Sequence, residues 1–284
     1  MDSKKKNSVS ITGIVPCFNA SETLREVITS LYNQIPPLQE IIVIDDGSTD
    51  ASSVIAKDMK CRVITLEQNF GRGHSRNIGI SECRTTYALF CDSTNILPSN
   101  FSANAIKHFK NSSIAAVFGR IVNHLKMTDA LSRWRGRNLF REHLDHRQDV
   151  HEVQCLISYA VLFRKDAVLE CGNFDRSLRK CEDQDIGQKL ISFGYKIISD
   201  PSLITYSIRR ETMTSLCIRF NRWFSDHQKE FNCWEAFINT LRSSMTIFLK
   251  DDFRSKDIRS MIISIFLPFW LLALGLFNKK KLIG

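Results

Sequence analysis

The sequence contains no pair of cysteines with Cys-x-x-Cys spacing. Its nine cysteines are scattered singly along 284 residues, some within apolar stretches such as Tyr87 to Cys91. Disulfide frameworks and zinc ribbons depend on paired or regularly spaced cysteines, so the sequence indicates neither of them. This usage of cysteine favours a reducing compartment.

The N-terminus has no apolar core of the kind that a signal peptide requires. Residues 1–8 form a polar tail, and the first apolar run, Val9 to Val15, is too short for such a core and leads directly into a turn. We therefore expect the folded part of the chain to stay in the cytosol.

Acidic residues are outnumbered, with 30 Asp and Glu against 39 Lys and Arg, which gives a formal net charge of +9. This surplus favours phosphate-rich partners such as nucleotides, anionic lipids or nucleic acid. The basic residues are dispersed and no recognisable nucleic-acid-binding module is present, so we expect no nucleic-acid partner. The length is sufficient for one sizeable α/β domain with an appendage.

Short apolar runs rich in β-branched residues alternate with helical patterns in the first half of the chain. This β-α-β-α order predicts an α/β fold with a parallel sheet and helices on both faces. The predicted strands are Val9–Val15, Ile41–Ile44, Arg62–Leu66, Thr86–Phe90 and Ile114–Ile121, and the predicted helices are Glu22–Asn33, Ala51–Met59 and Gly73–Glu82.

Polar segments follow the first four predicted strands directly. Ligands of open parallel sheets bind beyond the carboxyl ends of the strands, so these segments are expected to converge on one crevice. They are Pro16-Cys17-Phe18-Asn19, Asp45-Asp46-Gly47-Ser48, Asn69-Phe70-Gly71-Arg72-Gly73 and Asp92-Ser93-Thr94-Asn95.

Two of these segments have both an ordinary and a functional interpretation. Asp45 and Asp46 belong to a turn in which Ser48 or Asp50 can cap the next helix, yet adjacent carboxylates can also bind a base and a ribose. A Gly-x-Gly without a third glycine is a weak phosphate signal, yet a helix N-terminus beside Arg72 and Arg76 suits a diphosphate.

A cluster of acids, Glu182-Asp183-Gln184-Asp185, precedes a predicted amphipathic helix, Ile186 to Phe193. Acidic residues in a first helical turn complement the helix dipole and need no further role. From these residues alone, this ordinary interpretation is favoured.

Taken in order, these segments resemble glycosyltransferase family 2, a family of inverting enzymes with a GT-A fold, over about Ser10 to Pro201. The resemblance implies a GT-A, Rossmann-like nucleotide-diphospho-sugar transferase domain over residues 9–205, with a UDP- or GDP-sugar as donor. The segments that carry it are VPCFNASETLREVITSL, IIVIDDGSTD, NFGRGHSRNIGI, YALFCDSTNILPSNF and GNFDRSLRKCEDQDIGQKLISFGYKI.

The resemblance also implies roles for individual residues. Asp183 is expected to be the general base, with Glu182 and Asp185 in the same acidic motif. The residues expected to bind the donor are Pro16, Phe18, Asn19, Asp45, Asp46, Gly71, Arg72, Arg76, Asp92 and Ser93.

The sequence departs from the family where a strand normally ends in Asp-x-Asp. Thr94 replaces the second acid and Asn95 the acid after it, which leaves Asp92 as the expected ligand of Mg²⁺ or Mn²⁺. An inactive homologue that binds a sugar nucleotide as a scaffold is therefore an alternative. A nucleotidyltransferase is a further alternative, although the Gly-rich, Lys-bearing loop that it needs after the first strand is missing.

The remainder of the chain has two parts. The segment from Asn123 to His151 is basic and rich in histidine, and we interpret it as an acceptor-facing insertion before a strand-like stretch from Val153 to Phe163. Residues 206–284 are expected to be helical. Arg222 and Trp223 resemble the end of a Gln-x-x-Arg-Trp motif of polymerising members, but Arg219 occupies the glutamine position, which favours packing.

An apolar run of eighteen residues, 260–277, lies near the C-terminus. As a helix it would be about 27 Å long, against a hydrocarbon core of roughly 30 Å. Pro268 and basic residues on both sides fit a re-entrant or interfacial segment as well as a span, and a buried core helix or oligomer contact stays open. We expect association with the cytoplasmic face of a membrane, where a glycan or lipid-linked acceptor for surface polysaccharide or glycolipid synthesis is used.

Overall fold

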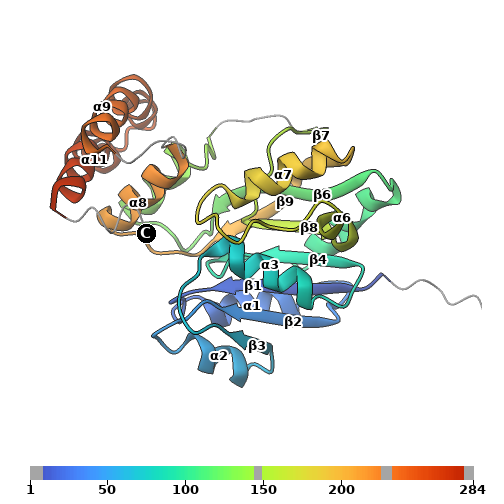
Figure 1. Cartoon of the computed structure of the whole chain (residues 1–284). Helices are drawn as coiled ribbons and strands as arrows, with labels where there is room; N and C mark the ends of the chain where they lie inside the picture. Colours follow the sequence, from blue (N-terminus) through green and yellow to red (C-terminus); the bar gives the residue numbers. More distant parts are fainter. Residues whose placement is uncertain (1–8, 144–148, 225–231, 278–284) are drawn as a thin grey trace, which may run out of the picture. The chain divides into compact units, whose positions relative to one another are not determined.

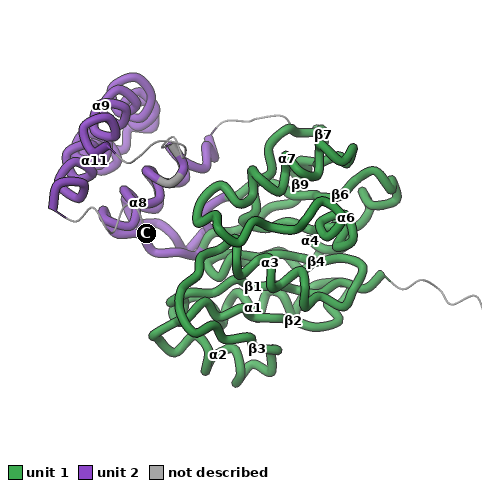
Figure 2. The backbone as a smooth tube through the Cα atoms, viewed as in Figure 1, with its two compact units in different colours: residues 1–121, 147–207 green, residues 122–146, 208–284 purple. Residues whose placement is uncertain are grey.

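The computed structural model describes residues 9–143, 149–224 and 232–277. The chain divides into two compact units (Figure 2). Unit 1 comprises residues 1–121 and 147–207, and unit 2 comprises residues 122–146 and 208–284. Residues 122–146 thus lie inside the region expected to form one continuous domain, yet they pack with the C-terminal helices.

Unit 1 is built on a sheet with the strand order β3-β2-β1-β4-β8-β6-β9-β5 (Figure 1). β1 pairs in parallel with β2 and β4, and β2 with β3. β8 is antiparallel to both β4 and β6, so β6 runs in the same direction as β4. The strands are β1 Ile11–Cys17, β2 Glu40–Asp45, β3 Arg62–Thr65, β4 Tyr87–Cys91, β5 Asn95–Ile96, β6 Ile114–Asn123, β7 His151–Glu152, β8 Ala160–Arg164 and β9 Lys196–Ser207.

Helices cover both faces of this sheet. On one face, a Cβ atom added at Gly13 of β1 would lie 3.7 Å from the side chain of Leu31 in α1. On the other face, the side chain of Ile14, the next residue of β1, would lie 2.5 Å from a Cβ atom added at Gly79 of α3. Successive strand residues point to opposite faces, so α1 and α3 pack on opposite sides of β1. The helical elements of unit 1 are α1 Leu24–Tyr32, α2 Ser52–Asp58, α3 Arg72–Glu82, α4 Phe101–Ala105, η1 Ile106–Lys110, α6 Lys165–Glu170 and α7 Glu182–Ser192.

The central strands are apolar along their whole length because both of their faces are covered. Every residue of β1 is buried, and Phe90, Phe163 and Phe174 pack edge-to-face with ring centroids 5.8–6.0 Å apart. The expected α/β fold with a mostly parallel sheet is confirmed. The strand expected over Val153–Phe163 is shorter in the structure, because β8 begins to pair with β4 only at Ala160.

Unit 2 is helical and has its own core. Trp134 of α5 packs there with Leu216, Phe248 and Leu267, which explains why residues 122–146 belong to this unit. The expected helical C-terminal region is confirmed, with the apolar run inside one long helix. The helical elements are α5 Ala130–Asn138, α8 Met213–Phe224, α9 Cys233–Ser243, η2 Ser244–Phe248, α10 Leu249–Arg254 and α11 Ile258–Phe277.

Candidate active site

Hydrogen bonds join the turns that follow β1 and β2. The backbone N–H of Asn19 donates to Oγ of Ser48 at 3.0 Å, and Oδ1 of Asn19 accepts from the backbone N–H of Thr49 at 2.8 Å. Asn19 has a φ of 48°, a left-handed conformation that asparagine tolerates better than most residues. Pro16 is buried within β1, and Phe18 is exposed at the rim of the joined turns.

Both carboxylates at the end of β2 are buried and support local structure. Oδ1 of Asp45 accepts from the backbone N–H of Ser48 at 3.0 Å, as expected for a turn-forming aspartate. The two oxygens of Asp46 accept from the backbone N–H groups of Phe70 and Gly71, each at 2.9 Å. Asp46 therefore holds the loop after β3 against the turn after β2.

This loop leads into α3 through Gly71, whose φ of 98° favours glycine. Arg72 begins the helix and stays partly exposed, with its Nε 3.7 Å from Oε1 of Glu182. Arg179, which the sequence did not suggest, donates to the backbone oxygen of Asn69 at 3.0 Å. This bond gives the loop between β3 and α3 a second anchor besides Asp46.

A buried arginine, Arg76, forms hydrogen bonds to two other predicted site residues. Arg76 of α3 is only 1% exposed, and it donates to Oδ1 of Asp92 at 2.8 Å and to a carboxylate oxygen of Glu182. Burial alone would lower the pKa of Arg76, but the charges of Glu182 and Asp92 outweigh it and the net shift is upward. The guanidinium therefore remains a cation between Asp92, which follows β4, and Glu182 of α7.

Glu182 is the buried anion of this cluster. Burial raises the pKa of a carboxyl group, but the nearby charges of Arg76 and Arg72 reverse that effect, and the pKa of Glu182 is lowered. The lowered pKa favours the carboxylate form of Glu182, whose partners are already in place. It is suited to orienting Arg72 and Arg76 rather than to exchanging protons.

The neighbouring acid, Asp183, has the opposite character. Its Oδ2 accepts from the backbone N–H and from the hydroxyl of Ser158, both at 3.3 Å. Burial, followed by the charge of Glu182, raises the pKa of Asp183, and the two arginines only partly offset this. A half-buried carboxylate that binds protons more readily than usual has the property required of a general base.

Asp185, in the same acidic motif, makes its ion pair with a residue outside the cluster of Arg76, Asp92, Glu182 and Asp183. Its carboxylate pairs with Lys189 one turn later along α7, with 2.8 Å between Oδ2 and Nζ. The cluster formed by Arg76, Asp92, Glu182 and Asp183 therefore does not include this expected site residue in the structure. A pair spaced i, i+4 on a helix is sufficient to explain the presence of Asp185.

The residues present fit a divalent cation only with help from a ligand. Asn95 is buried and donates to the backbone oxygen of Tyr159 at 3.1 Å, so its amide serves the sheet edge. Within residues 9–143, 149–224 and 232–277, no group of three or more His, Cys, Asp or Glu residues is arranged to hold a metal. Asp92 can supply one carboxylate, and the other ligands would come from a diphosphate and water, as is common for Mg²⁺.

Ser158 is the main residue of this site that the sequence did not reveal. It is buried, accepts from Arg76 through its backbone oxygen at 3.3 Å, and donates to Asp183. It lies 82 residues from Arg76 and 25 from Asp183, in a stretch without a motif. Only the pairing of β8 beside β4 brings it to the site.

Two other expected site residues lie in unit 2. Arg222 belongs to α8, and the ring of Trp223 packs near Phe140 with 6.0 Å between centroids. The guanidinium of Arg219 lies 5.9 Å from the centroid of the same Trp223 ring. The Trp223 ring is thus packed between Phe140 and Arg219. In the histidine-rich segment, residues 144–148 lie outside the described residues.

Comparison with curated proteins identifies relatives among glycosyltransferases. The chain is 25% identical over 253 residues to the poly-β-1,6-N-acetyl-D-glucosamine synthase of Staphylococcus epidermidis, which covers 86% of this chain and 61% of that protein. It is 24% identical over 209 residues to the pre-mycofactocin glycosyltransferase of Mycobacterium tuberculosis, covering 71% of this chain and 43% of that protein. The chain thus spans about three fifths or less of the length of these relatives.

Solved structures share the fold. A mannosyltransferase of Pyrobaculum calidifontis, in complex with GDP-Man and Mn²⁺, superposes with a TM-score of 0.60 at 14% identity, covering 95% of this chain and 87% of that chain. Residues 1–349 of Staphylococcus aureus TarS, in complex with UDP-GlcNAc, superpose with a TM-score of 0.58 at 17% identity, covering 96% of this chain and 74% of that chain. These likenesses identify the fold as GT-A.

The sequence pattern of glycosyl transferase family 2 matches residues 12–172, which extend from β1 through α6 and include the site residues from Pro16 to Ser158, but neither Arg179 nor the acidic motif of α7. The strand-end segments described above lie within this match. The chain therefore belongs to glycosyl transferase family 2.

Proposed function

We propose that this protein is an inverting glycosyltransferase that transfers a sugar from a nucleotide-sugar to an acceptor hydroxyl. The observation that carries the proposal is the contrast between two adjacent carboxylates. Glu182 has a lowered pKa beside Arg76, whereas Asp183 has a raised pKa and is held by Ser158. Divergent pKa values in neighbouring acids are typical of a site with an assigned base.

In the proposed reaction, Asp183 accepts the proton of the acceptor hydroxyl. The acceptor oxygen forms a bond to the anomeric carbon as the bond from that carbon to the diphosphate oxygen breaks, which inverts the configuration. The leaving nucleoside diphosphate carries the negative charge that develops, and the partly exposed Arg72 is placed to neutralise it. Proton transfer of this kind contributes roughly 10²–10⁴-fold to rate.

We propose Asp92 as the protein ligand of a divalent cation, Mg²⁺ or Mn²⁺, bound together with the donor. Such an ion would neutralise diphosphate charge during departure of the leaving group. Because Thr94 and the inward-directed Asn95 supply no second carboxylate, affinity for the free ion should be weak. The hydrogen bond from Arg76 to Oδ1 of Asp92, at 2.8 Å, holds this carboxylate in place.

A UDP-sugar is the donor that we favour, with N-acetylglucosamine as the first candidate, and a GDP-sugar is the second. The support comes from a poly-N-acetylglucosamine synthase among the relatives and a UDP-GlcNAc complex among the similar structures. The acceptor is proposed to be a glycan or a lipid-linked sugar at the cytoplasmic face of a membrane. One helix of the described residues, α11, is long and apolar enough to cross or enter a bilayer.

The test is a thermal-shift and sugar-release assay of the full chain with nucleoside diphosphates and nucleotide-sugars, in Mn²⁺, Mg²⁺ or chelator. We expect stabilisation by one base and slow sugar release that Asp92→Ala abolishes. No response to any nucleotide would contradict the proposal.

The structure also supports an alternative, a sugar-nucleotide-binding scaffold without turnover, because a second metal-binding acid is replaced by Thr94 and Asn95. In that case the donor would bind without release in every ion. Formation of pyrophosphate from a nucleoside triphosphate and a sugar phosphate would instead identify a nucleotidyltransferase.

A further inference from the structure

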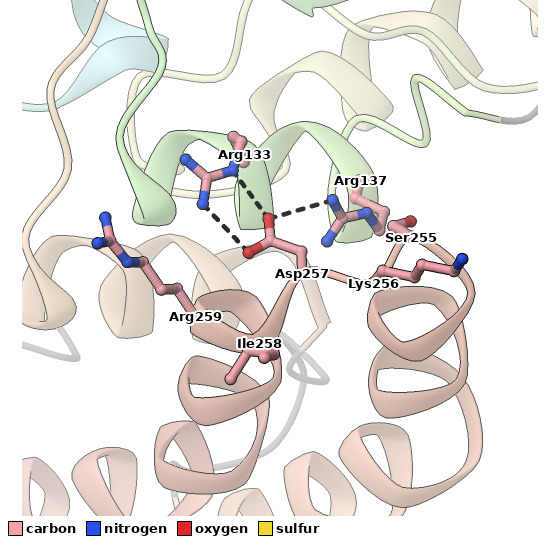
Figure 3. Close-up of a pocket in the computed structure, with 7 residues that line it drawn as sticks. All are labelled: Arg133, Arg137, Ser255, Lys256, Asp257, Ile258 and Arg259. Atoms are coloured by element: carbon pink, nitrogen blue, oxygen red, sulfur yellow. Dashed lines mark hydrogen bonds and ion pairs between the residues drawn. The ribbon is translucent and has the colours of Figure 1, made fainter.

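Unit 2 contains a basic pocket at the start of α11 that the proposed reaction does not use. The pocket has a volume of about 450 Å³ and is lined by four cationic side chains and one carboxylate, Asp257. Arg133 and Arg137 reach the pocket from α5, and the remaining lining comes from the loop between α10 and α11 and from the first two residues of α11 (Figure 3). The lining residues are Arg133, Arg137, Ser255, Lys256, Asp257, Ile258 and Arg259.

Two of the cations are fixed in place and two are available. Arg133 donates to both oxygens of Asp257, at 2.8 and 3.1 Å, and Arg137 donates to Asp257 at 3.3 Å. The bond from Arg133 holds the pKa of Asp257 well below its usual range, so this carboxylate stays charged. In the described part of the chain, the exposed side chains of Lys256 and Arg259 make no hydrogen bond or ion pair.

Large apolar side chains flank the pocket and face solvent. Phe253, just before the loop, and Ile258, just after it, are each 71% exposed. The exposed ring of Trp234 on α9 packs against Phe237, which packs against the exposed Phe269 of α11, so the apolar face continues across both helices. Basic groups beside an exposed apolar face are typical of segments that lie in a membrane interface.

The opposite face of α11 is tied into the core of unit 2 by polar contacts. The hydroxyl of Ser264 donates to the buried Asp252 at 2.6 Å and accepts from the indole N–H of Trp134 at 2.7 Å. Asp252 in turn pairs with Arg137 at 2.6 Å. If α11 crossed a bilayer alone, it would lose these contacts, whereas a helix lying in the interface keeps them and buries only its exposed face.

We propose that the pocket around Asp257 binds the phosphate of an anionic membrane lipid while the apolar face of α9 and α11 lies in the same leaflet. Fixed guanidinium groups suit phosphate oxygens, and the exposed Lys256 and Arg259 add charge at the surface. The inference deepens the membrane location proposed above and depends on it, but it does not depend on sugar transfer.

The experiment is co-sedimentation of the full chain with vesicles of phosphatidylcholine, alone or mixed with phosphatidylglycerol. We expect binding to mixed vesicles, weak binding to neutral ones, and a loss of roughly 30-fold in the variant Lys256→Gln/Arg259→Gln, since each surface cation contributes about fivefold. The matched control, Lys57→Gln/Lys60→Gln, removes the same charge from exposed positions of unit 1 and should bind like the wild type.

Other outcomes would overturn the proposal. Equal binding to neutral vesicles would mean that the apolar face acts alone. Binding of soluble glycerol 3-phosphate as tight as binding to mixed vesicles would indicate a free phosphate ligand, and a stable dimer without vesicle binding would indicate a second copy on this face. Thermal shifts with nucleotides on the same variants test the proposed transferase separately, because the substituted residues lie in unit 2.

Discussion

The buried guanidinium of Arg76 donates a hydrogen bond to Oδ1 of Asp92 at 2.8 Å, and the same guanidinium neutralises Glu182. One α3 side chain thus connects the end of β4 with the first turn of α7. Breaking a buried ion pair from one side leaves an uncompensated charge, which is costlier than loss of an exposed pair.

We therefore expect Arg76→Met to lower the free energy of unfolding by about 3–5 kcal/mol, measured by urea denaturation. Arg62→Met is the control, because its ion pair with Glu82 is partly exposed, with 33% and 41% of the two side chains accessible, and should contribute less than about 1 kcal/mol. Equal losses in the two variants would show that the Arg76 cluster is not a structural centre.

Asp183→Asn should reduce sugar transfer to a hydroxyl acceptor by roughly 10²–10⁴-fold while leaving nucleotide binding unchanged, because it removes only the proton acceptor. Asp185→Asn is the matched control, since Asp185 pairs with Lys189 and should lose little activity. Steady-state kinetics of both variants give the comparison. If Asp183→Asn retained most of the activity, the hydroxyl mechanism would be wrong and an already anionic acceptor, such as a polyprenyl phosphate, would be favoured.

Activity should decline on the acid side at a pH above the ordinary pKa of aspartate, about 3.9. A base works only when unprotonated, and burial together with Glu182 raises the pKa of Asp183. Glu182→Gln removes one of these causes and should move the acid limb of kcat/KM to lower pH. A limb that stayed in place would assign the titration to another group.

The adjacent residues Phe266 and Leu267 should separate membrane contact from core packing. Leu267 is fully buried in the core of unit 2, so Leu267→Ala should destabilise that unit by about 2–5 kcal/mol. Phe266 is 58% exposed, so Phe266→Ala should change thermal stability little but weaken vesicle binding. Reversal of these effects would place the opposite face of α11 against lipid.

Gly47 should not accept a side chain. Its φ is 73°, and an added Cβ would lie 2.6 Å from the backbone carbonyl carbon of Gln68. Gly47→Ala should therefore cost more than the roughly 1 kcal/mol of a left-handed alanine, because the loop held by Asp46 must shift. Gly172→Ala is the control, since φ is 92° there and nothing lies within 4 Å of the added atom. Equal melting temperatures of the two variants would contradict the steric argument.

Local patterns in the sequence were sufficient to predict much of unit 1. β-Branched runs predicted β1 to β4, and the glycine-rich and acidic segments after them predicted a site in the loops at this edge, which stays a prediction. This works because strand alternation and turn chemistry are local properties, and because parallel strands bring their carboxyl ends to one edge. The helical C-terminal region with its apolar run was predictable for the same reason.

Only the tertiary structure determined which hydrogen-bond partner each of these polar side chains has. Asp46 binds the Phe70–Gly71 backbone, Asn95 turns toward Tyr159, and Ser158 arrives beside Asp183 from a stretch without a motif. These partners are separated by 24 to 64 residues, so no local signal identifies them.

The same distinction applies to α11. Its sequence predicted an apolar helix of nearly membrane-spanning length. The contacts of Ser264 with Trp134 and Asp252 determine which face is buried and which is left exposed. Hydrophobicity is a property of the residues, whereas exposure depends on what the rest of the chain packs against them.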